Sequence, residues 1–283
     1  MGNDVRHTAQ DALRRIGLFD AEAIDPAEGA LWLAKWGEPK LNLDAYRRHL
    51  KNLVDDARAY VADDHRDDAL VVEAVQQVLA RRYGYVGAAN PAERNDEANI
   101  AHTIDRRRGG AMVLALLYRH VFHALGRQVE MIDFAPRTLI GMHMKGARTV
   151  LDPFDGGKVL GARELRALLK THQGERGALT PDHLKVLSSR QALLSLQHDI
   201  KAFHLLHAAP EAALMAVEGA LLIAPDAAPL WRELALLHER LDHLLDATHA
   251  LEHYLQLPGS GAHRYTASQK LQSLQRRLKG DET

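Results

Sequence analysis

The apolar segment Met112–Leu125 is the feature that most constrains the fold of this chain. Gly109-Gly110 stands before it and Gly126 directly after it, which is typical of the two ends of a buried helix. Beyond Gly126 the apolar pattern changes from a helical period to that of strands. A buried helix that leads straight into strands predicts an α+β domain.

Three strand-like runs follow this helix. They are Val129–Phe134, Leu139–Met144 and Thr149–Leu151, and Lys145-Gly146 is the expected turn between the second and the third. Because short runs joined by tight turns pair with their neighbours in the chain, we expect a small antiparallel sheet from Val129 to Leu151.

Amphipathic helices are predicted on both sides of this core. Apolar positions recur at helical spacing in three segments before it and in one after it. The predicted helices are 27–34, opened by Asp25-Pro26, then 43–62, 69–80 and 163–172. Gly87–Pro91 is expected to form a turn, and Gln173–Gly177 a surface connection.

From Gln191 onward the chain consists of two Ala/Leu-rich helical hairpins. Leu222–Pro225 and Leu255–Pro258 end them, 33 residues apart, and a capping helix is expected from Arg264 to Leu278. Paired helices with a period near 34 residues and a Pro after the second helix are typical of tetratricopeptide repeats. Plain antiparallel helices without repeat geometry are the alternative. The predicted domains are therefore 1–187 and 188–283.

Composition excludes several classes of protein. The net charge is −1 and aromatic residues make up 5% of the chain, which argues against nucleic acid or an anionic membrane as a partner. No apolar run approaches the roughly 20 residues of a membrane span, and the polar start Met1–Arg6 does not resemble a signal peptide. With no cysteine the chain has no disulfide and no thiolate metal ligand, and the composition fits a bacterial cytoplasm.

The order of the central parts is informative about chemistry. In a papain-like acyl-transfer core a nucleophile lies at a helix N-terminus, and a His and an Asp follow on successive strands. This chain has the same order: Arg107–Ala111, the apolar helix, the strands, and then Leu151–Phe154.

Several residues resemble the bacterial SirB-type family, in which a transglutaminase-like domain precedes tetratricopeptide repeats. The resemblance runs from about Ile24 through the repeats. It implies a papain-like α+β core and says little about biochemistry. It is carried by Asn99, Ile104, Arg107-Arg108-Gly109, Leu114, Leu117-Tyr118, Leu125-Gly126 and Asp152-Pro153-Phe154-Asp155-Gly156-Gly157.

The nucleophile expected from this resemblance is absent. Counting back from Gly126, which ends the central helix, places the nucleophile position at Ala111, whose methyl group cannot attack a carbonyl. Serine cannot replace it, because the first serine of the chain is Ser188. Thr103 lies before the Arg-Arg-Gly turn and not at the helix start, so it is a poor candidate.

The general base is also replaced. SirB-type sequences carry Pro-Gly-His-Phe on the strand after the central helix, whereas this chain has Ala135-Pro136-Arg137-Thr138. A guanidinium cannot accept a proton near neutral pH. His143 cannot serve instead, because six strand residues place it roughly 20 Å from Arg137. Asp152 remains at the third position, and we expect Arg137 and Asp152 to face each other across neighbouring strands.

Basic residues gather around this degenerate triad. Arg106, Arg107 and Arg108 precede the N-H groups that Gly109 and Gly110 expose at the helix start, and Arg137 is expected in the same space. This composition is typical of a site for a carboxylate or a phosphate. In the alternative interpretation Arg137 only pairs with Asp152, and the other arginines pair with acidic residues such as Asp96, Glu97 or Asp105.

The 17 histidines do not form a recognisable metal motif. His249 and His253 lie four residues apart and His120 and His123 three apart, both without a third ligand at motif spacing. His238-Glu239 lacks the second His of a His-Glu-x-x-His motif. We therefore predict neither a metal site nor a cofactor.

Three functions remain open. The first, which we favour, is a non-catalytic interaction or regulatory protein that binds a protein or peptide partner through its repeats. The second is a divergent enzyme that acts on an anionic substrate through Asp152, Arg137 and the arginine loop. The third is a sensor that binds a small anion in the same cleft without chemistry.

Overall fold

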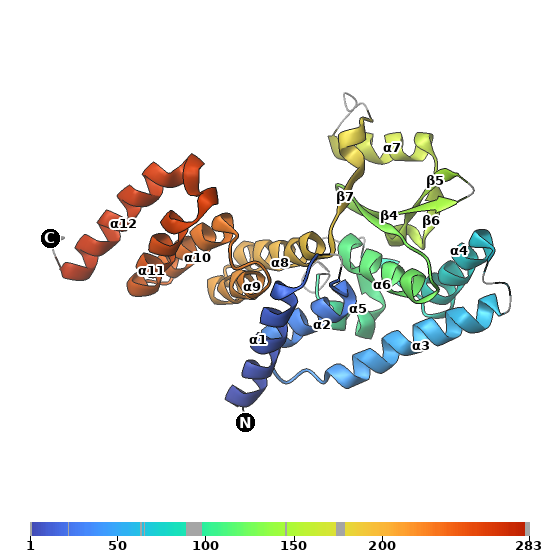
Figure 1. Cartoon of the computed structure of the whole chain (residues 1–283), viewed down its shortest axis with the longest axis horizontal. Helices are drawn as coiled ribbons and strands as arrows, with labels where there is room; N and C mark the ends of the chain where they lie inside the picture. Colours follow the sequence, from blue (N-terminus) through green and yellow to red (C-terminus); the bar gives the residue numbers. More distant parts are fainter. Residues whose placement is uncertain are drawn as a thin grey trace. The chain divides into compact units, whose positions relative to one another are not determined.

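The computed structural model describes residues 2–21, 23–62, 64, 66–88, 98–144, 146–173 and 179–280. They form two compact units, which we describe separately (Figure 1). One unit contains the described residues within 20–35 and 40–196, and the other those within 1–19, 36–39 and 197–283. Helix α1 (Gly2–Leu18) belongs to the second unit because it packs on α9 (Pro210–Ile223). The sequence did not reveal this contact, and the domain boundary at 187/188 stays a prediction.

An antiparallel sheet lies at the centre of the first unit. Its five strands follow the order β6-β5-β4-β3-β7. In chain order they are β3 (Glu130–Phe134), β4 (Arg137–Met144), β5 (Ala147–Asp152), β6 (Lys158–Leu160) and β7 (Lys185–Leu187). Register is fixed by pairs such as Met131↔Ile140 and Ile140↔Leu151.

The expected antiparallel sheet is confirmed, and two of its five strands were missed. Strands β6 and β7 have three residues each, too few for an alternating pattern to be recognised. A parallel pair was also not expected: β1 (Val86–Gly87) lies beside β2 (Arg108–Gly109). Gly87 therefore belongs to a strand and not to a turn, while Asn90 and Pro91 lie outside the described residues.

Both faces of the sheet are covered. Ile132, Leu139 and Val150 form one apolar cluster with Leu165 and Leu169 of α7 (Ala162–Gln173). Residues of the opposite parity are also buried, and α6 (Ala111–Ala124) contacts β3 and β4. Figure 1 shows α6 and α7 on opposite sides of the strands. The sheet is thus held between two helices, as expected for a papain-like α+β core.

The remaining helices of this unit begin at clear caps. They are α2 (Pro26–Gly37), whose last two residues belong to the second unit, α3 (Leu43–Val61), α4 (Asp68–Gln76) and α5 (Ile100–Arg106). The side chains of Asn42, Asp67 and Asn99 accept hydrogen bonds from backbone N-H groups two residues later, which stabilises the first turn. The helix predicted over 69–80 is interrupted, because a π-helical segment, η1 (Gln77–Arg82), continues α4.

The second unit is helical in its described part. Residues 197–206 of α8 (Ser189–Leu206) belong to this unit and lead through a turn into α9; residues 189–196 belong to the first unit. Helices α10 (Ala228–Arg240) and α11 (Leu244–Gln256) form the next hairpin, and α12 (Arg264–Lys279) packs on α11. Short 3-10 turns, η3 (Pro153–Asp155), η4 (Pro181–Leu184) and η5 (Pro258–His263), connect neighbouring elements.

The two hairpins repeat with a period of 34 residues. Ala208 and Asp242 both have left-handed backbones, with φ values of 54° and 59°. Each turn closes with equivalent hydrogen bonds, Ala209 N to His204 O and His243 N to His238 O, both of 2.9 Å. The second hairpin also fits the tetratricopeptide residue pattern, with Trp231, Leu234, Ala235, Ala247 and Leu251 at matching positions.

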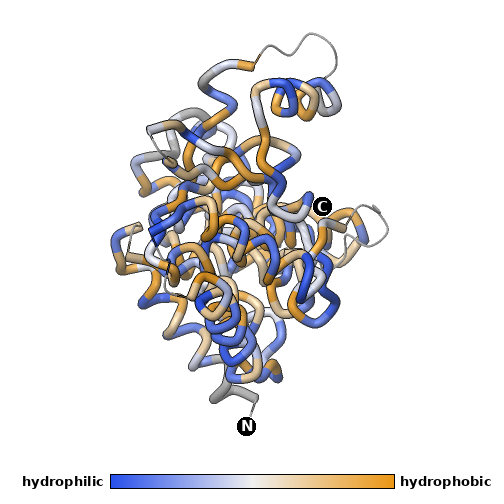
Figure 2. Tube along the Cα trace, turned by 90° about the vertical axis from the view of Figure 1, so that its right-hand side faces the viewer, coloured by the Kyte–Doolittle hydropathy of each residue, from blue (hydrophilic) through white to orange (hydrophobic). Residues whose placement is uncertain are grey.

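The helices are amphipathic rather than uniformly apolar. Figure 2 shows hydrophobic and hydrophilic residues alternating along most of them. Within the described part of the chain we find no helix that combines the length and the apolar character needed to cross a membrane.

Candidate functional site

The three triad-equivalent positions lie at the ends of the elements that the papain-like order predicts. Ala111 is the first residue of α6, and Gly110 occupies its N-cap without a capping side chain. Arg137 is the first residue of β4, and Asp152 is the last residue of β5. The three residues thus lie at the start of α6, the start of β4 and the end of β5, in the order that the sequence predicted.

Arg137 and Asp152 are in contact. The Nε atom of Arg137 lies 3.5 Å from Oδ2 of Asp152, and the side chains are 25% and 3% exposed. This is the facing arrangement expected from the sequence. No hydrogen bond to Arg137 Nε is present among the described residues, so the contact acts through charge and not through a well-directed N-H donor.

The surroundings of Asp152 act on its pKa in opposite directions. Its Oδ1 accepts a hydrogen bond of 3.0 Å from the backbone N-H of Phe154, and its backbone oxygen accepts one of 2.8 Å from Gly157. Burial raises the pKa of Asp152 above its usual value, while the charge of Arg137 and the Phe154 N-H oppose this shift. Arg137 is thus the principal charge that opposes the rise in the pKa of this buried carboxyl group.

An aromatic ring holds the other side of the Arg137 guanidinium group in place. Cζ of Arg137 lies 3.7 Å from the centroid of the Phe154 ring, a close cation–π contact. Gly87 packs so tightly on the same ring that a Cβ atom there would lie 2.2 Å from Phe154 Cδ1. Phe154 therefore connects the parallel β1–β2 pair to the position of the missing general base.

Tyr118 is a further polar group close to Asp152. Its side chain is fully buried on α6, and its hydroxyl finds no hydrogen-bond partner among the described residues. Burial raises its pKa, and the charge of Asp152 acts in the same direction. The Tyr118 ring also leaves no room for a side chain at Gly157, where a Cβ atom would lie 2.6 Å from Tyr118 Cε1.

Arg107, predicted to bind an anion, is engaged in a different cluster. It ends α5 in the left-handed conformation, with φ of 62°. Its Nη1 donates a hydrogen bond of 2.7 Å to the Tyr85 hydroxyl and a second to the backbone oxygen of Ile104. The Tyr85 hydroxyl and His49 Nε2 are 2.7 Å apart, and Arg107 Nη1 lies 3.0 Å from the same nitrogen.

This cluster fixes the protonation state of His49. The two hydrogens of Arg107 Nη1 are donated to the Tyr85 hydroxyl and the Ile104 oxygen, so the Tyr85 O-H is left to donate to His49 Nε2. His49 Nε2 is therefore an acceptor, and the imidazole is neutral. Burial, together with the charge of Arg107, lowers the pKa of His49 to about 4. No sequence pattern predicts this group, because its members come from three separated segments.

The rest of the predicted anion site is dispersed. Arg106 and Arg108 are exposed at the end of α5 and in β2, whereas Gly109 is buried. A Cβ atom at Gly109 would lie 2.5 Å from Thr103 Cγ2, so the glycine is needed for packing. Of the acidic partners considered, Asp105 accepts a hydrogen bond of 2.9 Å from Tyr46, while Asp96 and Glu97 lie outside the described residues. The cationic residue in contact with Asp152 is Arg137.

The histidine pairs considered from the sequence have ordinary surroundings. His253 stacks on Trp231 with ring centroids 3.9 Å apart, and His249 is exposed on the same helix. On α6, burial lowers the pKa of His120, and His123 is exposed. The search by motif spacing did not consider His243, which a turn brings beside His238.

The fold is that of a transglutaminase-like core with a small antiparallel sheet, followed by helical repeats. A family model described as the transglutaminase-like superfamily matches residues 44–197, and a tetratricopeptide repeat model matches residues 200–272. The chain belongs to the transglutaminase-like superfamily.

Two curated relatives match this chain over more than half of their length. A "UPF0162 protein" of Xylella fastidiosa (strain Temecula1) is 26% identical over 247 residues, which cover 86% of this chain and 87% of the relative. A "UPF0162 protein" of Vibrio cholerae is 28% identical over 167 residues, and this match spans 61% of the relative and 59% of this chain. No solved structure matches the chain.

Proposed function

We propose that this chain is a non-catalytic, cytoplasmic member of the transglutaminase-like superfamily, of the SirB type, that regulates or recruits another protein through its repeats. The contact of Arg137 with Asp152 and Phe154 carries the proposal. Arg137, at the position expected for the general base, is a permanent cation and cannot take up a proton. Asp152, the residue that would orient a catalytic His, is instead paired with this cation. Ala111 at the nucleophile position supports the same conclusion.

The repeats offer a surface for a partner. On α10, Arg232, Leu236 and Arg240 are spaced four residues apart and therefore share one helix face. Leu236 is 49% exposed, and Arg240 is exposed beside it. An apolar side chain flanked by two arginines fits a protein segment with an apolar anchor and acidic neighbours. Such a segment is the partner we propose.

A second candidate function is favoured by one observation. The side chain of Arg137 is 25% exposed, and its Nε lacks a hydrogen-bond acceptor among the described residues. The Nε atom is itself buried, so a small carboxylate or phosphate would contact the exposed part of the guanidinium first and gain a charge-assisted hydrogen bond from Nε on entering beside it. The chain would then be a sensor that binds a small anion without converting it. If a reaction also takes place there, the chain would be a divergent enzyme that acts on an anionic substrate.

Two measurements test the proposal. Intact-mass analysis after incubation with a reactive acyl ester should show no covalent adduct on residues 44–197, and an acyl-enzyme there would overturn it. Capture of partner proteins from the native cell should fail for Leu236→Glu and Arg240→Glu. It should persist for Leu245→Glu, a matched change at a 62% exposed leucine on α11. Capture insensitive to the α10 substitutions would exclude this surface.

The anion candidate has its own readout. Calorimetric titration with inorganic phosphate and with citrate should give no heat if the first proposal is correct. Binding that is abolished by Arg137→Gln and unaffected by Arg106→Gln would favour the second candidate.

A further inference from the structure

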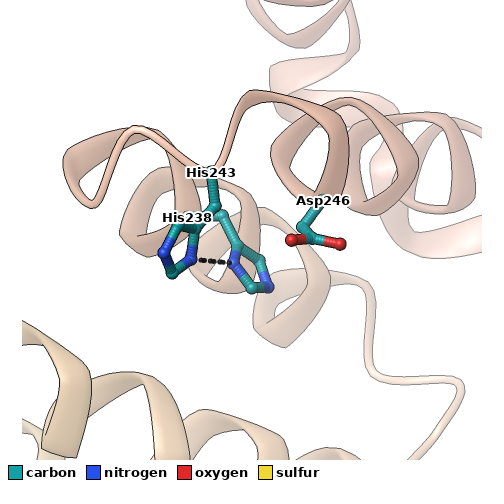
Figure 3. A group of neighbouring side chains, drawn as sticks. All are labelled: His238, His243 and Asp246. Atoms are coloured by element: carbon teal, nitrogen blue, oxygen red, sulfur yellow. Dashed lines mark hydrogen bonds between the residues drawn. The ribbon is translucent and has the colours of Figure 1, made fainter.

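The turn between α10 and α11 brings two imidazoles and a carboxylate together. Figure 3 shows His238 and His243 side by side, with the carboxylate of Asp246 beside them on the next helix. The Nδ1 atoms of the two histidines are 3.4 Å apart, and one potential ligand atom from each of the three residues lies within 4.8 Å of the others. This grouping lies far in sequence from the degenerate triad.

The backbone of the turn determines these positions. His243 N donates to His238 O over 2.9 Å and Asp242 N to Glu239 O over 3.0 Å, which is the hydrogen-bond pattern of a Schellman motif. That motif places the side chains at its two outer positions, here His238 and His243, against each other. His243 is also the N-cap of α11, and Asp246 is the third residue of that helix, the position closest to an N-cap side chain.

The preceding repeat shows that the turn does not require these side chains. In its turn between α8 and α9, Ala208 has a left-handed backbone as Asp242 does, and the equivalent closing hydrogen bond is also 2.9 Å long. The residues equivalent to His238, His243 and Asp246, each 34 positions earlier, are His204, Ala209 and Ala212. Since alanines form the same turn, His243 and Asp246 are additions to the fold and not necessities of it.

The geometry matches the demands of a transition-metal ion. Two ligands bound at about 2.0–2.1 Å to a tetrahedral zinc ion lie about 3.4 Å apart, as the two Nδ1 atoms do. His238 is half-buried, while His243 and Asp246 are exposed, so an ion could enter from solvent. Burial, the largest cause, and His243 lower the pKa of His238 while Asp246 opposes them, which favours the neutral imidazole that binds metals.

Other carboxylates at this corner are occupied. Glu239 pairs with Lys270 at 2.7 Å, and Asp242 pairs with Arg277 at 3.0 Å. Among the described residues no lysine or arginine forms an ion pair with Asp246, so its carboxylate can approach the two imidazoles. We propose that His238, His243 and Asp246 form a binding site for a Zn²⁺-class ion, with water completing the coordination.

The donor set defines the class of ion. Two imidazole nitrogens and one carboxylate oxygen suit Zn²⁺, Ni²⁺ or Cu²⁺, whereas Mg²⁺ and Ca²⁺ prefer sites made of oxygen alone. Bound at this corner, the ion joins the end of α10 to the first turn of α11. It therefore stabilises the second repeat in the conformation that presents Leu236.

Titration calorimetry with Zn²⁺ on the full, tag-free, metal-free chain tests the site. We expect one strong site per chain, a raised melting temperature with Zn²⁺, and no heat with Mg²⁺. His243→Ala and Asp246→Ala copy the preceding repeat and so preserve the turn. Each should weaken Zn²⁺ binding at least tenfold without changing the melting temperature of the metal-free protein. His249→Ala, at an exposed histidine of the same helix, is the matched control and should bind as the parent does.

A gain-of-site variant completes the test. Ala209→His with Ala212→Asp recreates the proposed ligand set around His204 and should raise the stoichiometry from one ion to two. Parent-like Zn²⁺ binding in the His243→Ala/Asp246→Ala double variant would overturn the proposal. So would an unchanged stoichiometry in the gain-of-site variant, because the turn geometry would then not be what creates the site.

Discussion

The Cζ atom of Arg137 lies 3.7 Å from the centroid of the Phe154 ring, and Nε of the same guanidinium lies 3.5 Å from Asp152 Oδ2. One cation thus bridges an aromatic ring and a buried carboxylate. Burying a carboxylate is costly unless an opposite charge accompanies it. Arg137, Asp152 and Phe154 therefore form a self-consistent structural unit.

The first prediction is that Asp152→Asn rescues Arg137→Ala. Arg137→Ala leaves the Asp152 carboxylate buried and unpaired, and we expect it to lower the free energy of unfolding by about 3 kcal/mol. Asp152→Asn removes the charge but keeps an oxygen that can accept the Phe154 N-H. The double variant should therefore be more stable than Arg137→Ala alone. Urea unfolding of the three variants measures this, and strictly additive losses would contradict the pairing.

A second prediction concerns the pH dependence of the same variant. Arg137 is the principal charge that lowers the pKa of Asp152, so Arg137→Ala should move that pKa further above its unfolded value. A raised carboxyl pKa favours the protonated folded state, so stability is gained as pH falls through it. Relative to the parent, Arg137→Ala should recover stability as the pH falls from neutral through the raised pKa of Asp152. The control, Arg137→Ala/Asp152→Asn, should show no such recovery.

The sequence predicted the elements of the site better than its contacts. The apolar period of 112–125 and the strands after Gly126 were sufficient for the α6–β3–β4–β5 order, since burial periodicity is a local property. Arg137 facing Asp152 also followed, because strand spacing brings adjacent strands within side-chain reach. Phe154 was noticed as part of a motif, and its contact with Arg137 was not expected.

The contacts that were missed depend on the tertiary fold. Arg107 was predicted beside the α6 N-terminus, but Tyr85 and His49, from distant segments, engage its guanidinium. The His238–His243 contact was missed because it crosses a left-handed turn, whereas the search used the spacings of a continuous helix. Two-residue strands such as β1 have no period to read.

The third prediction is that Gly87→Ala destabilises the first unit. The added Cβ atom would lie 2.2–2.4 Å from three atoms of the Phe154 ring. Because the ring also packs against the Arg137 guanidinium, it cannot easily move away. We expect a loss of about 1–3 kcal/mol, typical of overpacking. Gly37→Ala is the control, because a Cβ atom there meets nothing within 4 Å. Thermal melts should separate the two, and adding Phe154→Leu should recover part of the Gly87→Ala loss.

The last prediction is that His49 makes the first unit sensitive to acid. The folded-state pKa of His49, about 4, lies below its ordinary value of 6.5, because the imidazole is partly buried and faces Arg107. The unfolded chain therefore binds a proton that the folded chain does not, and stability falls as the pH drops from about 6.5 to about 4. His49→Gln, which can still accept from Tyr85, should reduce this loss, whereas the exposed-site control His249→Gln should not. Histidine C2-H chemical shifts, followed against pH by NMR, should show His49 titrating well below the ordinary histidine value of 6.5. A normal His49 titration near 6.5 would show that the imidazole is not the acceptor at the centre of this cluster.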